Sequence, residues 1–528
     1  METTPTTPRS STNHTPNPGR SAMEQLETEN PAENTPSLSR TVAIILSITC
    51  ITGISNLLAG LLTVCIPVIA NDLHIAPGLQ LWPASAFALA CGCTLLVCAT
   101  IADVVGCRRT CLLGALLQAG SSLGAGLSRT PTQLVALRAF AALPHLCACP
   151  ALRGSYHGRF QATADQEAGL LLLLPWAAVK PLVLVSLGLA LGGIFSDTVG
   201  WRWGFHATSI LNIVVLFIAL WSLPSSIDKD APLSQSTITR LRRDLDWIGA
   251  LIISTSLACL SYVLAAVTHS DASRQMLEPA NLSLLFAGLL LLPVYVFWMH
   301  RQTALGRPAL IPNELWRNKA FTSVCVTVFL VWGGLNASEQ LASLYLQDVR
   351  GFSALTSSLY FLPAPVCGVL TSVAVALVMP YLRVSLAVPL ACFVSGLAPL
   401  LLAVLCRVDG PSYWQAMFQA MALNPIGADL MYTIAMLVVT NAFPLETQAL
   451  AGGVFNMLAQ IGKSVGIATT AIIAQQVTTP LMKDVEMREA LLRGYHAGWW
   501  YNCGISFVSV GVGFWGLRSV GRLGIKRD

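Results

Sequence analysis

Four of the ionisable side chains that stand inside long apolar runs of this sequence are candidates for proton chemistry. They are Arg138, Glu339, Asp429 and Lys463. A charge in apolar surroundings is costly, so such a group usually faces an opposite charge or a water-filled cavity. Carboxylates and amines in that setting can bind and release protons. We therefore predict that these four residues take part in proton coupling, and a purely structural role is the alternative for each of them.

Asp429 is the acid best placed by its neighbours to carry a proton. It lies one helical turn from Tyr432 and from Pro425, and a proline inside an apolar helix locally opens the backbone. Lys463 stands in the next apolar run, so two opposite charges lie in neighbouring segments. We predict that Asp429 and Lys463 exchange partners, with Asp429 protonated in one state; a static pair is the alternative. Glu339 is the second acid candidate.

Polar residues recur at helical spacing around these charges. Asn456, Gln460 and Lys463 stand at positions i, i+4 and i+7, which puts them on one helix face. His145 shares a face with Arg138 in the same way. The candidates for a wet substrate cavity are Asn456, Gln460, Trp332, Asn336, His145 and Tyr432. The alternative is that they only pack or form hydrogen bonds between helices.

The composition is that of a polytopic membrane protein. Of the 528 residues, 54% are hydrophobic and only 11% are charged, whereas soluble domains carry about 25% charged residues. The net charge of +5 gives no indication of nucleic-acid binding. The sequence contains no Walker loop and no H-E-x-x-H, so an ATP-driven pump and a membrane enzyme are both disfavoured. The 15 cysteines have no metal-ligand spacing, and we expect no metal site.

The apolar runs predict fourteen membrane-spanning helices, because each run approaches the roughly 20 residues that a span needs. Their period is helical or absent, which gives an all-α fold. Arginines and lysines concentrate in alternate connecting segments when the N-terminus is put in the cytoplasm. Both termini are then cytoplasmic, as an even number of spans requires.

The short polar stretch ADVVGCRR interrupts the apolar runs between the second and third spans. Its residues Asp103, Gly106, Arg108 and Arg109 resemble the loop signature G-x-L-A-D-R-x-G-R-K of the major facilitator superfamily. In that family the loop packs against a neighbouring helix end and acts in conformational gating. The alternative is a plain positive-inside loop.

Further stretches resemble the 14-helix drug:proton antiporters of this superfamily, and their fungal efflux-pump branch in particular. GWRWGF resembles the start of their sixth helix, and LDWIGALI the entry to their inserted seventh helix. ALAGGVFNMLAQIGKSVG and LYFLPAPVCGVL resemble the fungal branch. The fifth-helix pattern G-P-x-x-G-G is represented by Gly188, Gly192 and Gly193, without its proline.

The resemblance implies a major facilitator fold in which two six-helix halves flank two inserted helices. The expected parts are a disordered cytoplasmic tail (1–40), a first half (41–223), a cytoplasmic linker (224–246), two inserted helices (247–299), a second half (320–517) and a basic cytoplasmic tail (518–528). Substrate would bind near the midplane between the halves and be moved by alternating access.

The function implied is a secondary transporter that exports a small organic molecule, such as a drug, toxin or secondary metabolite, in exchange for protons. We expect the proton gradient as the energy source and no cofactor. The expected partners are the small-molecule substrate, protons and the lipid bilayer, with no nucleic acid; the chain would act as a monomer in the plasma membrane rather than the vacuole. Alternatives are a proton symporter for a nutrient or a cation, and a relative that does not transport.

Overall fold

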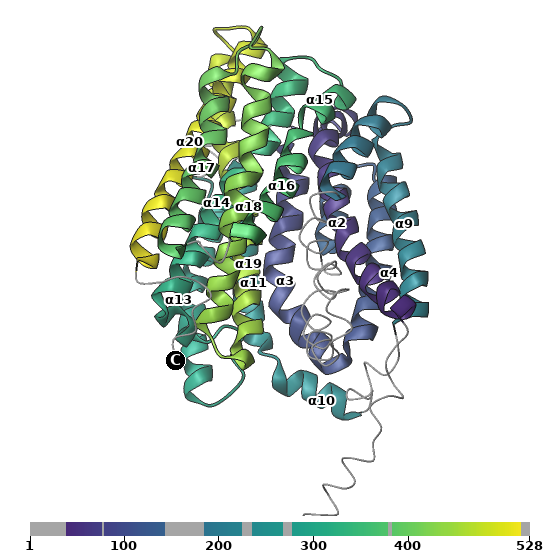
Figure 1. Ribbon diagram of the computed structural model, residues 1–528, viewed down its shortest axis with the longest axis vertical. Helices are drawn as coiled ribbons and strands as arrows, with labels where there is room; N and C mark the ends of the chain where they lie inside the picture. Colours follow the sequence, from purple (N-terminus) through teal and green to yellow (C-terminus); the bar gives the residue numbers. More distant parts are fainter. Residues whose placement is uncertain are drawn as a thin grey trace, which may run out of the picture.

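The computed structural model describes residues 38–76, 79–142, 184–223, 235–267, 277–378 and 383–518. These residues form helices joined by short loops (Figure 1). Eleven helices among them are long and apolar enough to cross a membrane. Length and composition of the described helices therefore agree with an all-α, multi-pass membrane protein.

The helices group into two bundles that stand side by side (Figure 1). The first bundle contains α2 (Leu38–Asp72), α3 (Trp82–Val105), α4 (Cys107–Leu127), α5 (Pro131–Phe140), the helix Leu184–Asp197 and α9 (Trp201–Ser222). The second contains α14 (Lys319–Leu344) with its continuation η6 (Tyr345–Val349), α15 (Ala354–Tyr360), α16 (Pro363–Val378), α17 (Val384–Leu405), η8 (Tyr413–Gln415), α18 (Met417–Ala442), α19 (Leu445–Leu481) and α20 (Met487–Leu517).

Between the bundles in sequence lie α10 (Gln235–Asp244), α11 (Trp247–Val267), α13 (Pro279–Ala304) and η5 (Asn313–Arg317). α11 and α13 pack against each other, and α11 also contacts α3 and α19. The two expected inserted helices therefore form a hairpin where the bundles meet. Asp246 holds this hairpin, because its carboxylate accepts hydrogen bonds from the backbone N–H of Gly249 (2.9 Å) and from the indole of Trp298 on α13 (3.0 Å).

Three of the fourteen expected spans lie outside the set of eleven. The span expected at 132–152 begins as α5 and then leaves the described residues, as His145 does. The span expected at 168–195 is described only as the helix Leu184–Asp197. The span expected at 497–517 is the second part of α20.

Local sequence signals set several helix ends. Gly106, with φ of 109°, ends α3 and begins α4 in a conformation that glycine adopts without strain. Thr130 caps α5 by accepting a hydrogen bond from the backbone N–H of Gln133 (3.3 Å). Asn318 caps α14 in the same way, accepting from the backbone N–H of Ala320 (3.1 Å).

Glycines allow helix backbones to touch in both bundles. A Cβ on Gly188 would lie 1.9 Å from the carbonyl oxygen of Leu57, so the helix Leu184–Asp197 rests directly on α2. In the second bundle, a Cβ on Gly462 would lie 2.3 Å from the carbonyl oxygen of Phe329, so α19 rests on α14. Small residues at helix contacts are the usual packing solution where apolar lipid surrounds the protein.

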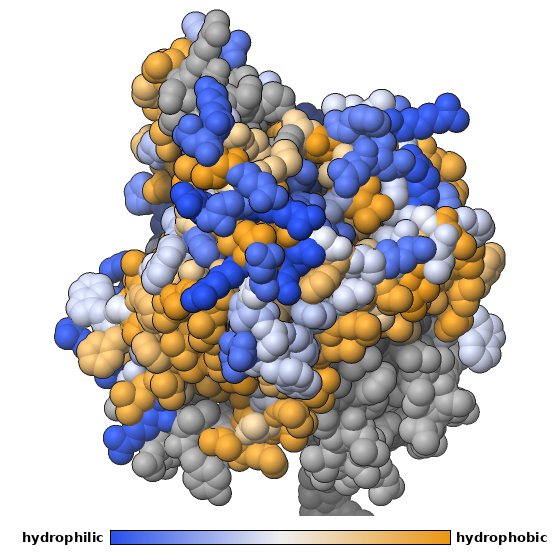
Figure 2. Space-filling view, turned by 90° about the horizontal axis from the view of Figure 1, so that it is seen from above, coloured by the Kyte–Doolittle hydropathy of each residue, from blue (hydrophilic) through white to orange (hydrophobic). Residues whose placement is uncertain are grey.

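The outer surface has the polarity of a membrane protein. Seen from the end at which α15 lies, hydrophilic side chains gather over the end of the molecule and apolar side chains cover its flanks (Figure 2). Large apolar residues on the flanks are more than half exposed, including Phe217, Trp221, Leu251, Phe297 and Trp515. A soluble protein seldom exposes so much apolar surface, whereas lipid would cover it.

Candidate functional site between the two bundles

Arg138 on α5 is the most deeply buried cation of the described residues. Its side chain is only 2% exposed, and its guanidinium carbon lies 4.5 Å from the ring centre of Phe87 on α3. Its Nε and Nη1 groups have no hydrogen-bond partner among the described residues. The phenyl ring thus supports one face of a cation whose donors remain unsatisfied.

Lys463 on α19 lies close enough to Arg138 for the two positive charges to interact. The carboxylate whose charge interacts with Lys463 is Glu339 of α14. The thiol of Cys91, on α3, also lies within reach of both cations. Lys463 on α19 therefore interacts electrostatically with both Arg138 on α5 and Glu339 on α14, although no ion pair joins these three side chains among the described residues.

The contact between α14 and α19 sets the position of Lys463 along the helix axes relative to the residues of α14. Phe329 and Gly333 of α14 pack on Gly462 and Gly466 of α19, with a Cβ on Gly466 only 2.4 Å from the Cα of Gly333. Trp332 directly precedes Gly333, and Lys463 directly follows Gly462. This register places Lys463 level with Leu330, so Trp332 and Lys463 stand at nearly the same level, about two residues apart along the helices.

Three predicted cavity residues come together from three helices. The rings of Trp332 on α14 and Tyr432 on α18 lie 4.9 Å apart at an angle of 33°. The Tyr432 hydroxyl donates to the side-chain oxygen of Asn456 on α19, and the Asn456 amide donates to the carbonyl oxygen of Gly452 (2.9 Å). The result is an aromatic surface held in a fixed position by a hydrogen bond to the neighbouring helix.

Asp429 lies one turn before Tyr432 on α18, and its Oδ2 atom is buried without a hydrogen-bond partner among the described residues. No charged group of the described residues interacts with Asp429. The exchange of partners between Asp429 and Lys463 stays a prediction. In this structure the carboxylate whose charge interacts with Lys463 is that of Glu339.

The remaining cavity candidates are not brought to the same point. The amide of Asn336 donates to the carbonyl oxygen of Trp332 on its own helix (2.8 Å). Gln460 is half-buried on the same stripe as Asn456. His145 lies outside the described residues.

Hydrogen bonds between the bundles involve polar residues that the sequence analysis did not single out. The hydroxyl groups of Ser85 on α3 and Ser464 on α19 lie 2.9 Å apart. The amide of Gln340 on α14 donates to the hydroxyl of Thr63 on α2 (2.9 Å), and Ser343 donates to the Thr63 carbonyl oxygen (2.7 Å). The sequence signal for these contacts was a small polar residue inside an apolar helix. It could not identify the partners, because they lie hundreds of positions away in the sequence.

Hydrogen bonds of the predicted gating loop join elements of the first bundle. The Nε of Arg108 donates to the carbonyl oxygen of Leu223, at the end of α9 (2.9 Å). Arg109 donates to the carbonyl oxygen of Val105 (3.1 Å), while Asp103 is exposed. A cation at a helix C-terminus is favourable, so Arg108 ties α4 to α9; the gating role stays a prediction.

Of the three fifth-helix glycines, two face α2 and one faces the other bundle. Gly188 and Gly192 lie against Leu57 and Leu61 of α2. A Cβ on Gly193 would lie 2.7 Å from the Cα of Leu355 on α15. Gly193 thus allows the bundles to approach each other closely.

The GWRWGF motif joins three elements at one end of the first bundle. The guanidinium of Arg202 forms an ion pair with Asp72 at the end of α2, and it also donates to the carbonyl oxygen of Ser128 after α4 (3.3 Å). The Trp201 indole donates to the same Asp72 carboxylate (3.1 Å). This motif is therefore a structural clamp, since none of these partners belongs to the other bundle.

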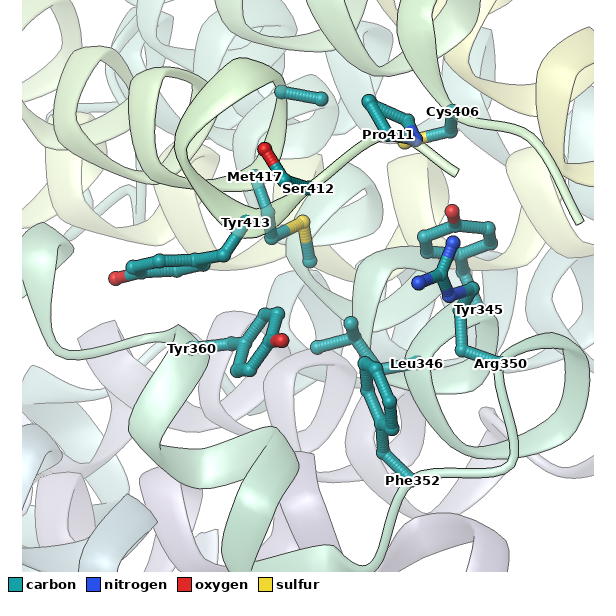
Figure 3. A pocket seen from close by; sticks show the side chains of 11 residues that line it. Tyr345, Leu346, Arg350, Phe352, Tyr360, Cys406, Pro411, Ser412, Tyr413 and Met417 are labelled. Carbon is teal, nitrogen blue, oxygen red and sulfur yellow. The ribbon is translucent and has the colours of Figure 1, made fainter. Parts of the chain in front are cut away.

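A small cavity lies in the second bundle, among η6, α15, η8 and the start of α18. Its walls include Tyr345, Arg350, Phe352, Tyr360 and Tyr413 (Figure 3). Its volume is about 20 Å³, which is the space that about one water molecule needs. It is too small for an organic substrate.

The comparisons with known proteins agree with this arrangement. Residues 48–467 match the Major Facilitator Superfamily. The chain belongs to this family. It is therefore an integral, multi-pass membrane transporter rather than an enzyme, and the expectation of a major facilitator protein is confirmed at the level of the superfamily.

Among its relatives is MFS-type transporter 1 of Pyricularia oryzae, which is 34% identical over 92% of this chain and 85% of its own length. The multidrug resistance protein Stp of Mycobacterium tuberculosis is 23% identical over 81% of this chain and 75% of its own length. The solved nucleoside transporter NupG shares the fold, with a TM-score of 0.57 and 11% identity over 90% of this chain and 99% of its own.

Proposed function

We propose that this chain exports a small organic molecule, such as a drug, toxin or secondary metabolite, by alternating access driven by the proton gradient. Fourteen spans, cytoplasmic termini, a plasma-membrane location and a monomeric state belong to this proposal. The observation that carries it is the electrostatic interaction of Lys463 with both Arg138 and Glu339 between the bundles. Charges are retained at membrane depth where they serve a transport pathway or a proton relay.

In this proposal the substrate binds beside the aromatic surface of Trp332 and Tyr432, and the two bundles rock around it. The hydrogen bonds Ser85–Ser464 and Gln340–Thr63 hold one state and break in the other. Relatives whose names denote drug resistance, Stp among them, support export as the direction.

Asp429 is the proposed proton carrier and Glu339 the second acid. A buried carboxyl with an unpartnered oxygen is more stable protonated than ionised. Asp429 would therefore hold a proton while enclosed and release it when its surroundings become hydrated. Because no charged residue of the described structure interacts with Asp429, its protonation state is free to follow the proton gradient.

The test measures export from a yeast strain that lacks its own efflux pumps. Cells that express the chain at their surface are loaded with a panel of fluorescent and toxic organic compounds, and efflux is followed with and without a protonophore. We expect efflux of a subset of compounds that the protonophore abolishes. Surface-expressed protein that moves none of the compounds would count against the proposed export.

The coupling role is tested with Asp429→Asn and a matched control, Asp409→Asn. Both substitutions remove one carboxylate, but Asp409 lies exposed in the loop after α17. Asp429→Asn is expected to abolish protonophore-sensitive efflux, whereas Asp409→Asn retains it. Near-normal, pH-dependent efflux by Asp429→Asn would remove Asp429 from the mechanism.

A further inference from the structure

We propose that Arg138 and Lys463 together bind the acid group of an organic anion, whose apolar body lies against Trp332 and Tyr432. The inference rests on the proposed function, because it names the substrate class of the same transporter. The ligand is an aromatic or otherwise flat organic acid that carries one negative charge.

The charge balance of the cluster is the first argument. Arg138 and Lys463 contribute two positive charges, and Glu339 is the carboxylate of the described residues that interacts with Lys463. Asp429 does not add to the balance, because it interacts with neither cation. Among the described residues of the cluster one positive charge is therefore in excess, and a monoanionic ligand neutralises it.

The state of Arg138 is the second argument. The Nε and Nη1 groups of this 2% exposed guanidinium lose their hydration without gaining acceptors among the described residues. The Phe87 ring supports its face but accepts no hydrogen bond in the plane of the guanidinium. A ligand acid group supplies oxygen acceptors in that plane, and arginine binds such groups with strong, charge-assisted hydrogen bonds.

The aromatic pair is the third argument. Trp332 stands at nearly the same level as Lys463, and its ring lies 4.9 Å from that of Tyr432. Trp332 and Tyr432 are each only half-buried, so their rings keep surface for contact. A ligand with its acid group at the cations can therefore rest its apolar body on this pair.

The two cations come from different bundles, which connects binding to movement. Arg138 belongs to α5 of the first bundle and Lys463 to α19 of the second. An anion held by both therefore favours the arrangement in which the bundles are close. The Glu339 carboxylate competes with the ligand acid group for Lys463, because its negative charge already interacts with that of Lys463.

The experiment measures equilibrium binding to the purified full chain in nanodiscs of phosphatidylcholine. The probes are radiolabelled 1-naphthylacetate and its neutral analogue 1-naphthylacetamide, which differ only in the acid group. Without a membrane gradient the assay does not depend on export or proton coupling. Its failure is thereby distinguished from failure of the proposed function. We expect the acid to bind about ten times more tightly than the amide.

Substituting a cation is expected to weaken acid binding, whereas substituting Glu339 is expected to strengthen it. Misfolding cannot strengthen binding, so the two effects together separate a binding role from a folding role. Arg138→Gln and Lys463→Met are expected to bring the acid down to the affinity of the amide, and Arg138→Lys to keep part of the preference. Glu339→Gln is expected to tighten acid binding about threefold or more and leave the amide unchanged. Arg407→Gln, which removes an exposed cation from the loop after α17, serves as the matched control and keeps the preference.

Three results would overturn the inference. The first is the lack of any preference for the acid, including binding of neither probe. The second is an acid preference that survives in folded Arg138→Gln and Lys463→Met. The third is weaker acid binding by Glu339→Gln, which would mean that Glu339 itself contacts the ligand. Glu339→Gln keeps both cations, so it tests the inference even where the loss of Arg138 or Lys463 impairs folding.

Discussion

Two helix pairs at corresponding places in the two bundles differ in what they carry. In the first bundle α2 contacts the helix Leu184–Asp197 through Gly188, and in the second α14 contacts α19 through Gly462. These are the first and fifth expected spans of each half. The close backbone packing is thus shared, whereas among the described residues only the second pair carries charges in the middle of its helices, namely Glu339 and Lys463.

The difference separates architecture from mechanism. A feature present in both pairs is explained by packing, since small residues let helices approach in lipid. A charge present in only one pair is not needed for that packing, and its burial costs free energy that a functional role must justify. The comparison therefore assigns the glycines to stability and the charged residues to transport.

The largest expected effect concerns the shared feature. Gly188→Ala and Gly462→Ala each drive a Cβ into a backbone carbonyl, at 1.9 and 2.3 Å. Overpacking a core typically costs roughly 1–3 kcal/mol, and a clash with backbone costs more. We expect both variants to lose most of the monodisperse protein in fluorescence-detected size-exclusion chromatography. Gly120→Ala, where nothing lies within 4 Å, is the control, and a normal yield of both test variants would refute the packing role.

A second prediction concerns the contact between the bundles. Ser85→Cys combined with Ser464→Cys replaces hydroxyl groups that lie 2.9 Å apart and is expected to form a cross-link under oxidation. Efflux should fall to background and return with a reductant. Because the chain has 15 cysteines of its own, each single variant is oxidised in parallel. Full efflux by cross-linked protein would show that this contact persists throughout transport.

The smallest expected effect compares one polar contact from each bundle. Cys65 contacts Ser196 in the first bundle (3.1 Å between Sγ and Oγ), and Asn456 accepts from Tyr432 in the second. Cys65→Ala is expected to lower the thermal unfolding temperature slightly and leave KM unchanged. Asn456→Ala frees Tyr432 and is expected to raise KM about tenfold, the equivalent of one hydrogen bond. Equal effects on KM would contradict the division between the bundles.

Much of the candidate site could be predicted from helical periodicity. Trp332, Tyr432 and Asn456 were predicted from their faces, and they meet in the structure. The partner of Lys463 was not predictable, because Asp429 and Glu339 both lie in apolar helices of the same half. Periodicity defines the face of one helix, but the rotation and crossing of packed helices decide which faces meet.

The sequence by itself determined that this protein spans a membrane and where its charged and small residues fall along each helix. Those properties depend on composition and on the fixed 3.6-residue turn, which are local. Only the tertiary structure decided that Lys463 interacts with the charges of Glu339 and Arg138 rather than with that of Asp429. It also decided that Arg108 binds the end of α9. These pairings join residues that are distant in sequence, and they follow from how closely the glycine contacts let particular helices approach.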